Sequence, residues 1–376
     1  MTKHNTSEKP AFNSRHQLEA LRKHLERGDS MIPLQGYFNF TKTPHTWVDG
    51  MLLRDFGLER TTRTWISARI EMTQLLEKFA ACDPQVSGLD YPRHYPARIL
   101  FGNAALAQSQ DVFLYFPYGA NIVSEDEQDV FGFELFETSE RIFSTIHAPC
   151  IIQALDAESA ALFHRQLFGC VPETLQLYAM LHEMSHRLGP WKVIPKADPR
   201  LKVGGWRLAV MGELAADLTL LHVANMFPEL MLQIFLNRIF WYGRRGFSSD
   251  RKHALLNQDN DACGAAWLWQ KFMQKGALRI LHGRINLDLM LLRKTFDDCY
   301  HEVLELGQRL SSMQDGQKEA FDAWLQQTVP HEDGQLVLPA SMRAVYERCA
   351  GAPDALPPRI IPTSGASQFS LAGNPC

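Results

Sequence analysis

Two histidines four positions apart, His182 and His186, form an H-E-x-x-H pattern with Glu183 beside the first of them. Residues four apart on an α-helix lie one turn apart on the same face, so both rings can point at one ion. Zinc takes nitrogen ligands at about 2.0–2.1 Å with tetrahedral geometry, which suits such a helical turn. We expect Glu183 to project beside the ion, where it can take a proton from water that the metal has acidified. The pattern therefore predicts a metal site with Glu183 as the catalytic base.

A catalytic zinc needs a third protein ligand, usually a carboxylate or a histidine. Glu213 is the best candidate, because it lies on the next predicted helix after a loop that contains Pro195, Pro199 and two glycines. Asp217 follows one helical turn later on the same face. We expect it to accept the second ring N–H of one histidine, which fixes the tautomer and makes the ring a better ligand.

A chance match is the alternative reading, since His and Glu are common on exposed helices. The predicted motif helix is largely apolar, however, and so is the helix around Glu213. Buried histidines and acids need partners or an ion, because an isolated buried charge is costly. These surroundings favour a metal site.

Hydrolysis through a tetrahedral oxyanion also needs a donor besides the metal. The side chains that could supply it are Tyr178, His222, Tyr242, His253, Arg244 and Arg245. We assign His253, in a polar segment between helices, and Tyr242 as the candidate catalytic donors. Arg244 and Arg245 are assigned to substrate binding, because a guanidinium can hold a carboxylate through two hydrogen bonds. A solvated loop histidine and a solvated pair of arginines are the alternatives.

The elements that would carry these residues indicate a predominantly α-helical α+β fold. Alternating or continuous apolar runs predict strands near residues 99–101, 111–116 and 131–136. Helices are predicted by their apolar periodicity and their caps. They cover residues 14–27, 59–81, 157–167, 172–188, 206–226, 228–242, 261–275, 285–311 and 316–328.

These elements suggest a helical metal-binding lobe and a smaller mixed α/β lobe. We place a disordered tail at residues 1–12, the mixed lobe at 13–155, the helical catalytic lobe at 156–330 and a C-terminal extension at 331–376. The extension ends in a Pro-, Gly- and Ser-rich tail, which predicts a flexible or surface-pinned end.

Composition narrows the class of protein. The net charge of −4 argues against a nucleic-acid partner, which would need a basic face. No apolar run reaches the length of a membrane span, and the N-terminus lacks the apolar core of a signal peptide. The seven cysteines are scattered without C-x-x-C spacing, so a reducing cytoplasm is expected.

Three segments resemble the dipeptidyl-peptidase III family and its smaller bacterial and plant cousins. Residues 182–190 read HEMSHRLGP, which is similar to an H-E-x-x-H-x-x-G-P form in those cousins. Residues 212–217, GELAAD, resemble the second family motif. Residues 118–122, YGANI, resemble a segment that lines the substrate cleft of the family.

The resemblance implies a mostly helical zinc lobe, a mixed lobe, and hydrolysis of a short peptide or amide. It implies His182, His186 and Glu213 as zinc ligands, Glu183 as the base and Asn121 as a substrate contact. The leading hypothesis is therefore a zinc hydrolase acting on a small substrate.

Two other hypotheses stay open. Two histidines and a carboxylate also form the site of non-haem Fe(II) oxygenases, so an iron-dependent oxygenase, lyase or isomerase is an alternative. A metal-stabilised binding protein without an open coordination position is another, although Glu183 argues against it.

Overall fold

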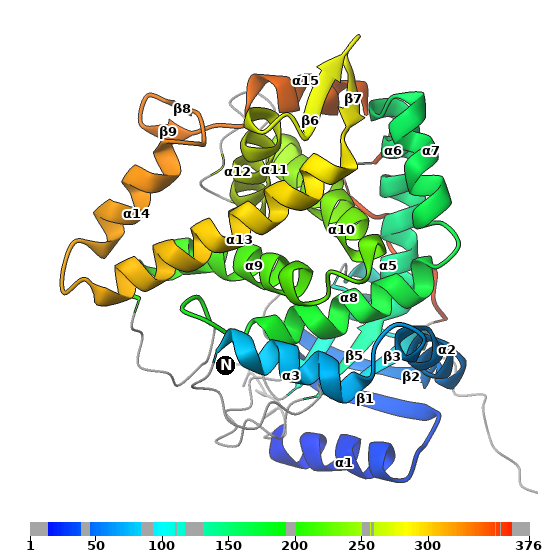
Figure 1. The fold of residues 1–376 in the computed structure, drawn as a ribbon. Coiled ribbons are helices and arrows are strands. Elements are labelled where there is room, and N and C mark those ends of the chain that lie inside the picture. The colour runs from blue at the N-terminus through cyan, green and yellow to red at the C-terminus, as the bar shows by residue number, and fades with distance from the viewer. Residues whose placement is uncertain are drawn as a thin grey trace, which may run out of the picture. The chain divides into compact units, whose positions relative to one another are not determined.

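The structure is a computed structural model that describes residues 14–38, 46–83, 93–109, 111–116, 131–192, 201–249, 256, 259–349, 351–353 and 355–362. Helices dominate these residues, and one five-stranded sheet accompanies them (Figure 1). The predicted α+β, mostly helical class is confirmed. Among the described residues, no helix combines the length and the apolar character that crossing a bilayer requires.

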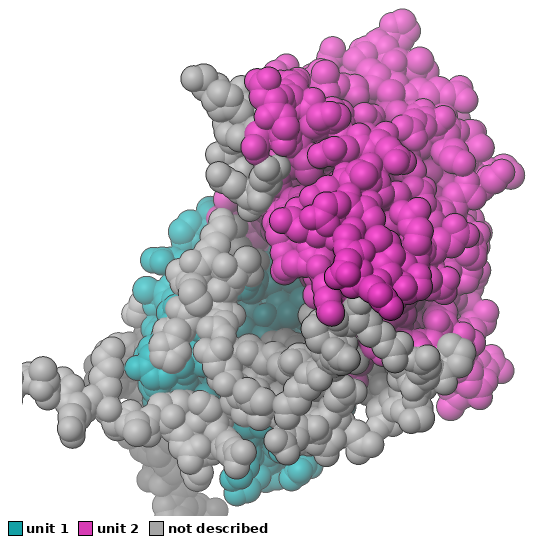
Figure 2. Space-filling model, turned by 90° about the vertical axis from the view of Figure 1, so that its left-hand side faces the viewer, with its two compact units in different colours: residues 1–57, 93–138, 357–376 teal, residues 58–92, 139–356 magenta. Residues whose placement is uncertain are grey.

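The chain forms two compact units, each assembled from separate stretches of sequence and coloured separately in Figure 2. Unit 1 comprises Met1–Gly57, Arg93–Thr138 and Pro357–Cys376, and unit 2 comprises Leu58–Pro92 and Ser139–Leu356. These limits differ from the contiguous division that we predicted with a boundary at residue 155. That division remains a prediction about folding domains.

Unit 1 is built around the five-stranded sheet, in the order β1-β2-β3-β5-β4. Neighbouring strands are antiparallel except β3 and β5, which are parallel. The strands are β1 (Met31–Phe38), β2 (Thr46–Arg54), β3 (Arg93–Gly102), β4 (Phe113–Phe116) and β5 (Phe131–Leu135). The strand predicted near residues 99–101 lies within β3, and those predicted near 111–116 and 131–136 overlap β4 and β5. β1 and β2 were not predicted.

Alternation of buried and exposed residues explains how this sheet makes a core. In β1 every second side chain is buried, including Ile32 and Leu34, because successive side chains point to opposite faces of a strand. β5 is buried along its whole length, as expected for a strand between two neighbours. Helices α1 (Ser14–Glu26) and α4 (Ala104–Gln108) contribute Leu18, Leu21 and Leu106 to the same core.

Unit 2 is helical apart from two small two-stranded sheets. Its elements are α2 (Phe56–Ser67) and α5 (Phe136–Ile142), both of which begin in unit 1, then α3 (Met72–Cys82), η3 (Phe143–His147), α6 (Ala148–Ala154), α7 (Ala157–Gln166), α8 (Val171–Ser185), α9 (Gly205–Val223), α10 (Pro228–Phe235), η4 (Leu236–Tyr242), α11 (Gly243–Ser249), α12 (Asn260–Gln274), β6 (Leu278–Leu281), β7 (Arg284–Leu287), α13 (Leu289–Ser312), α14 (Gln317–Gln326), β8 (His331–Glu332), β9 (Gln335–Leu336) and α15 (Ala340–Arg348). The η elements are turns of π-helix.

Two helices predicted from periodicity differ from the structure. The pattern over 59–81 is broken at residues 68–71, where α2 ends and α3 has not yet begun. The helix predicted to begin at residue 285 begins at Leu289, because residues 284–287 pair as β7 with β6 through a tight turn. His282 and Gly283, the two residues of that turn, adopt positive φ values, as the central residues of a tight β-hairpin turn do.

Helices α8 and α9 carry the predicted site and pack against each other (Figure 1). Pro172 stands in the first turn of α8, where its missing N–H costs nothing. Gly189 follows the helix with φ of +71°, a backbone conformation that favours glycine. α9 also packs against α12 and α13, so it lies in the middle of unit 2.

The C-terminal region predicted as an extension contributes to the core. α15 buries Met342, Val345 and Tyr346, and the Tyr346 hydroxyl donates to the carbonyl of Ile239 at 2.6 Å. Further on, Arg359 is buried in unit 1 and donates to the Ser109 carbonyl at 2.6 Å. Residues 363–376 lie outside the described part of the chain.

Candidate metal centre

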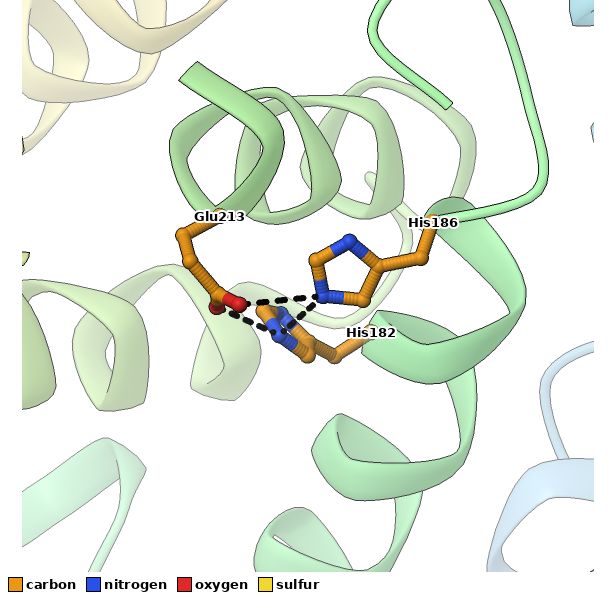
Figure 3. A group of neighbouring side chains, drawn as sticks. All are labelled: His182, His186 and Glu213. Atoms are coloured by element: carbon orange, nitrogen blue, oxygen red, sulfur yellow. Dashed lines mark hydrogen bonds and ion pairs between the residues drawn. The ribbon is translucent and has the colours of Figure 1, made fainter. Parts of the chain in front are cut away.

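His182, His186 and Glu213 converge in unit 2, as Figure 3 shows. The two Nε2 atoms lie 3.0 Å apart. Glu213 presents one carboxylate oxygen 3.2 Å from His182 Nε2 and the other 3.6 Å from His186 Nε2. The His182 ring on α8, the ring of its C-cap residue His186 and a carboxylate on α9 therefore surround one point.

These spacings fit a tetrahedral zinc ion. Ligands at about 2.05 Å in tetrahedral geometry lie about 3.3 Å from one another, close to the three separations observed. Two imidazole nitrogens and one carboxylate are also a donor set that catalytic zinc sites use. The Glu213 side chain is 35% exposed, so solvent can reach the cluster. The residues present therefore fit zinc with room for a further ligand.

Asp217 contacts His182 at Nδ1, the ring nitrogen that does not face the cluster. Its Oδ1 accepts a hydrogen bond from His182 Nδ1 at 2.8 Å, and a carboxylate can only accept. The proton of a neutral His182 therefore sits on Nδ1, which leaves a lone pair on Nε2 facing the cluster. The Nδ1 atom of His186 is buried without a hydrogen-bond partner among the described residues, so the two histidines are held differently.

Arg238 pairs with the other oxygen of Asp217, and both side chains are fully buried. Its guanidinium also donates to the backbone carbonyl of Glu213 at 2.8 Å and lies 3.4 Å from Asp261. Burial alone would raise the pKa of Asp217, but Arg238 and His182 outweigh it and hold the pKa below its ordinary value. Asp217 is therefore a fixed anion.

Substituting Asp217 by asparagine is expected to weaken zinc binding by about 10–100-fold, the usual cost of losing an acceptor behind a ligating histidine. Competition with a chromophoric chelator measures the affinity. Asp298→Asn is the matched control, because Asp298 is an exposed acid on α13 whose ion-pair partner among the described residues is Lys275. If the zinc affinity of Asp217→Asn changed by less than twofold, the hydrogen bond from His182 to Asp217 would not strengthen zinc binding.

The metal-free cluster should make folding stability depend on pH. Burial would lower the pKa of His182, but Asp217 and Glu213 raise it to about 10. Between about pH 6.5 and 10 the folded state then binds a proton that the unfolded state releases. Stability is therefore full below pH 6.5 and falls as pH rises toward 10, by up to about 1.4 kcal/mol per pH unit.

Urea unfolding of chelator-treated protein, followed by tryptophan fluorescence, measures this slope. The matched variant is His182→Gln. In it the loss of unfolding free energy that His182 causes at high pH should vanish, while the contributions of all other titrating groups remain. Equal slopes in the two proteins between pH 7 and 9 would contradict the assignment.

Glu183 follows His182 on α8 and is half-buried. Its carboxylate makes no hydrogen bond or ion pair with any residue that the structure describes. Glu213, by contrast, contacts both histidines. Burial alone would raise the pKa of Glu213, but His186 and His182 outweigh burial and hold that pKa below its ordinary range. The two acids of the site therefore differ: one faces the cluster and the other is unengaged beside it.

Tyr242 is the last residue of η4. Its ring centre lies 5.0 Å from the guanidinium of Arg238, which contacts the Glu213 carbonyl, and 4.8 Å from that of Arg245. Burial and then the charge of Asp261 raise its pKa above the ordinary value, so the hydroxyl remains a hydrogen-bond donor. This placement is compatible with the predicted role as oxyanion donor.

The two arginines predicted to bind substrate have other partners. Arg244 is buried and donates to the carbonyl of Ala352 at 2.7 Å and to that of Cys349 at 3.5 Å. The sequence interpretation is corrected here: Arg244 holds the chain after α15, because buried carbonyl groups need donors. Arg245 pairs with Asp261 at 2.6 Å, which neutralises much of its charge. Asn121 and His253 lie outside the described residues.

Sequence reasoning missed Arg238 and the role of Asp261. A single arginine in the apolar run LNRIFWY was the available signal, because a buried guanidinium requires acids around it. Asp259 caps α12 by accepting from the Ala262 N–H, whereas Asp261 directs its charge at Arg238 and Arg245.

The fold is that of dipeptidyl-peptidase III. Solved structures that match it include those from Caldithrix abyssi, with a TM-score of 0.63, and from Corallococcus sp. strain EGB, with a TM-score of 0.59. Both are 14% identical in sequence, and the matches cover 91% and 92% of this chain. No protein-family model and no curated protein sequence matches the chain.

The chain spans less than two thirds of these proteins, since the matches cover 62% and 64% of their lengths. The predicted resemblance is confirmed as a structural one. The chain shares the fold of dipeptidyl-peptidase III.

Proposed function

We propose that this protein is a zinc-dependent hydrolase that cleaves an amide or peptide bond of a short substrate. The observation that carries the proposal is the convergence of His182, His186 and Glu213 on one point, with an unengaged Glu183 next to the first ligand. The shared fold with two dipeptidyl-peptidase III structures supports the same class of reaction.

The residues divide the work between binding and proton transfer. His182, His186 and Glu213 would hold zinc, which polarises a carbonyl and lowers the pKa of water. Glu183 accepts the proton of the attacking water and then donates it to the leaving amine. Tyr242, a protonated phenol near the cluster, donates a hydrogen bond to the developing oxyanion. Asp217 and Arg238 keep the His182 ring in its ligating tautomer.

Metal analysis combined with a substrate panel tests the proposal. Protein purified without added metal is expected to contain one zinc per chain, and a chelator should remove both the metal and the activity. Zinc should restore the activity. The panel consists of peptides of graded length, with products identified by mass spectrometry; release of dipeptides from the N-terminus would extend the analogy with the structural neighbours.

Iron in place of zinc, together with oxygen-dependent turnover, would instead support an Fe(II) enzyme on the same ligands. A protein that binds no transition metal tightly would contradict both functions.

A further inference from the structure

A second group of metal-ligating side chains lies on unit 2, away from the first. His222 in the last turn of α9 faces Asp297 and His301, which are one turn apart on α13. The ligand atoms of these three residues all lie within 4.8 Å of one another. His222 lies nine residues after Glu213, which is about 13 Å along the helix, so the two groups are separate.

The separations within this group suit one ion. His222 Nδ1 lies 2.8 Å from one oxygen of Asp297, and His301 Nε2 lies 3.8 Å from the other oxygen. A tetrahedral zinc would space its ligands about 3.3 Å apart, between these two values. His301 and Asp297 are more than half exposed, so modest rotations of both side chains are open to them.

The ring of His222 is held in position by its neighbour. It stacks on Tyr300, with ring centres 4.1 Å apart and planes inclined by only 11°. Tyr300 is buried in α13 and shares a hydrogen bond with Cys82. One of the three ligands is therefore oriented before an ion arrives, which reduces the entropy lost on binding.

The group also adjoins an open space. His222 and Asp297 contribute to the lining of a cavity of about 620 Å³, whose other walls include Leu221, Met231 and Phe296. A metal held by three side chains at this edge keeps coordination positions for water or a small ligand in the cavity. The i to i+4 spacing on α13 places His301 beside Asp297, and its ring lies 5.5 Å from that of His222, so all three side chains meet at one place.

We propose that His222, Asp297 and His301 bind a divalent transition metal ion of the zinc, copper or nickel group. Two imidazoles and a carboxylate are the donors these ions prefer. The site is more exposed than the His182 centre, and among the described residues no buried acid hydrogen-bonds to His222 or His301 from behind. It therefore binds zinc at least about tenfold more weakly than that centre.

Calorimetric titration of the chelator-stripped full chain with Zn²⁺ tests this site. The wild-type protein is expected to bind two equivalents, the second more weakly. His301→Ala and Asp297→Asn should each weaken the second equivalent by about tenfold or more and leave the first unchanged. His186→Ala should do the reverse, so failure of either site is seen independently of the other.

His331→Ala is the matched control, since His331 is an exposed histidine of unit 2 outside both groups. It should retain both equivalents. Cu²⁺ spectroscopy adds a second readout: nitrogen coupling from the weaker site should decrease in His301→Ala. A wild-type protein with a single equivalent, or a second equivalent unchanged in both His301→Ala and Asp297→Asn, would overturn the proposal.

Discussion

Glu183→Gln is expected to lower kcat by about 10²–10⁴-fold while the protein keeps its zinc. Glutamine has nearly the same shape as glutamate but cannot accept a proton at neutral pH. Glu183 does not belong to the cluster of ligand atoms, so the metal content should stay at the wild-type value. Turnover of the best peptide of the panel and elemental analysis of the same preparation measure both quantities.

Glu173→Gln is the control for this variant, because Glu173 lies in the first turn of the same helix, ten residues before Glu183. It changes the charge of α8 by the same amount but should leave kcat within about twofold of wild type, as a surface change far from the reacting groups would. If Glu183→Gln kept more than half of the wild-type kcat, Glu183 would not be the catalytic base.

Arg238→Met is expected to destabilise the metal-free protein by about 3–5 kcal/mol, because it removes one partner from a fully buried charge pair. Asp217 loses the cation on its second oxygen, and the Glu213 carbonyl loses its donor. Methionine fills much of the volume, so the effect reports electrostatics more than packing. Urea unfolding monitored by tryptophan fluorescence gives the free energy of unfolding.

Arg207→Met is the matched control. Arg207 pairs with both oxygens of Asp322 at 2.6 and 2.7 Å, yet both side chains are partly exposed. Its loss should cost about 1 kcal/mol or less, as for other solvent-accessible pairs. The double variant Asp217→Asn with Arg238→Met should lose less stability than the two single variants together, because the partners are coupled. Additive losses, or equal effects of Arg238→Met and Arg207→Met, would contradict a buried pair.

The helices of unit 2 could largely be predicted from sequence, because each one buries an apolar face against its neighbours. Positions such as Leu177, Leu181 and Met184 repeat with the period of a helix, and burial of that face stabilises α8 regardless of its partners. β1 and β2 were missed. β1 and β2 pair with each other across a short connection, but the other edge of β2 is completed only by β3, which is distant in sequence.

The break between α2 and α3 has a similar cause. Ile66 and Ile70 are four positions apart, the spacing of neighbours on one helical face, so periodicity alone predicts a single helix. Arg69, in the break, instead pairs with Glu229 on α10 at 2.8 Å. The direction of the chain at this point is set by contacts with another helix, which no local pattern contains.

The i to i+4 spacing on a helix was sufficient to pair His182 with His186 and Glu213 with Asp217, since one turn of helix brings such side chains together whatever surrounds them. Tertiary packing decided which acid meets which histidine, because only the approach of α9 to α8 places Glu213 at the ligand face and Asp217 behind His182. Tertiary packing also determined the partners of the arginines. The π-helical η4 buries Arg238 against Asp217, and Arg244 donates to carbonyl groups after α15. A buried charge pairs with residues that folding brings together from distant segments. Its partner therefore cannot be predicted from the spacing of residues along one helix.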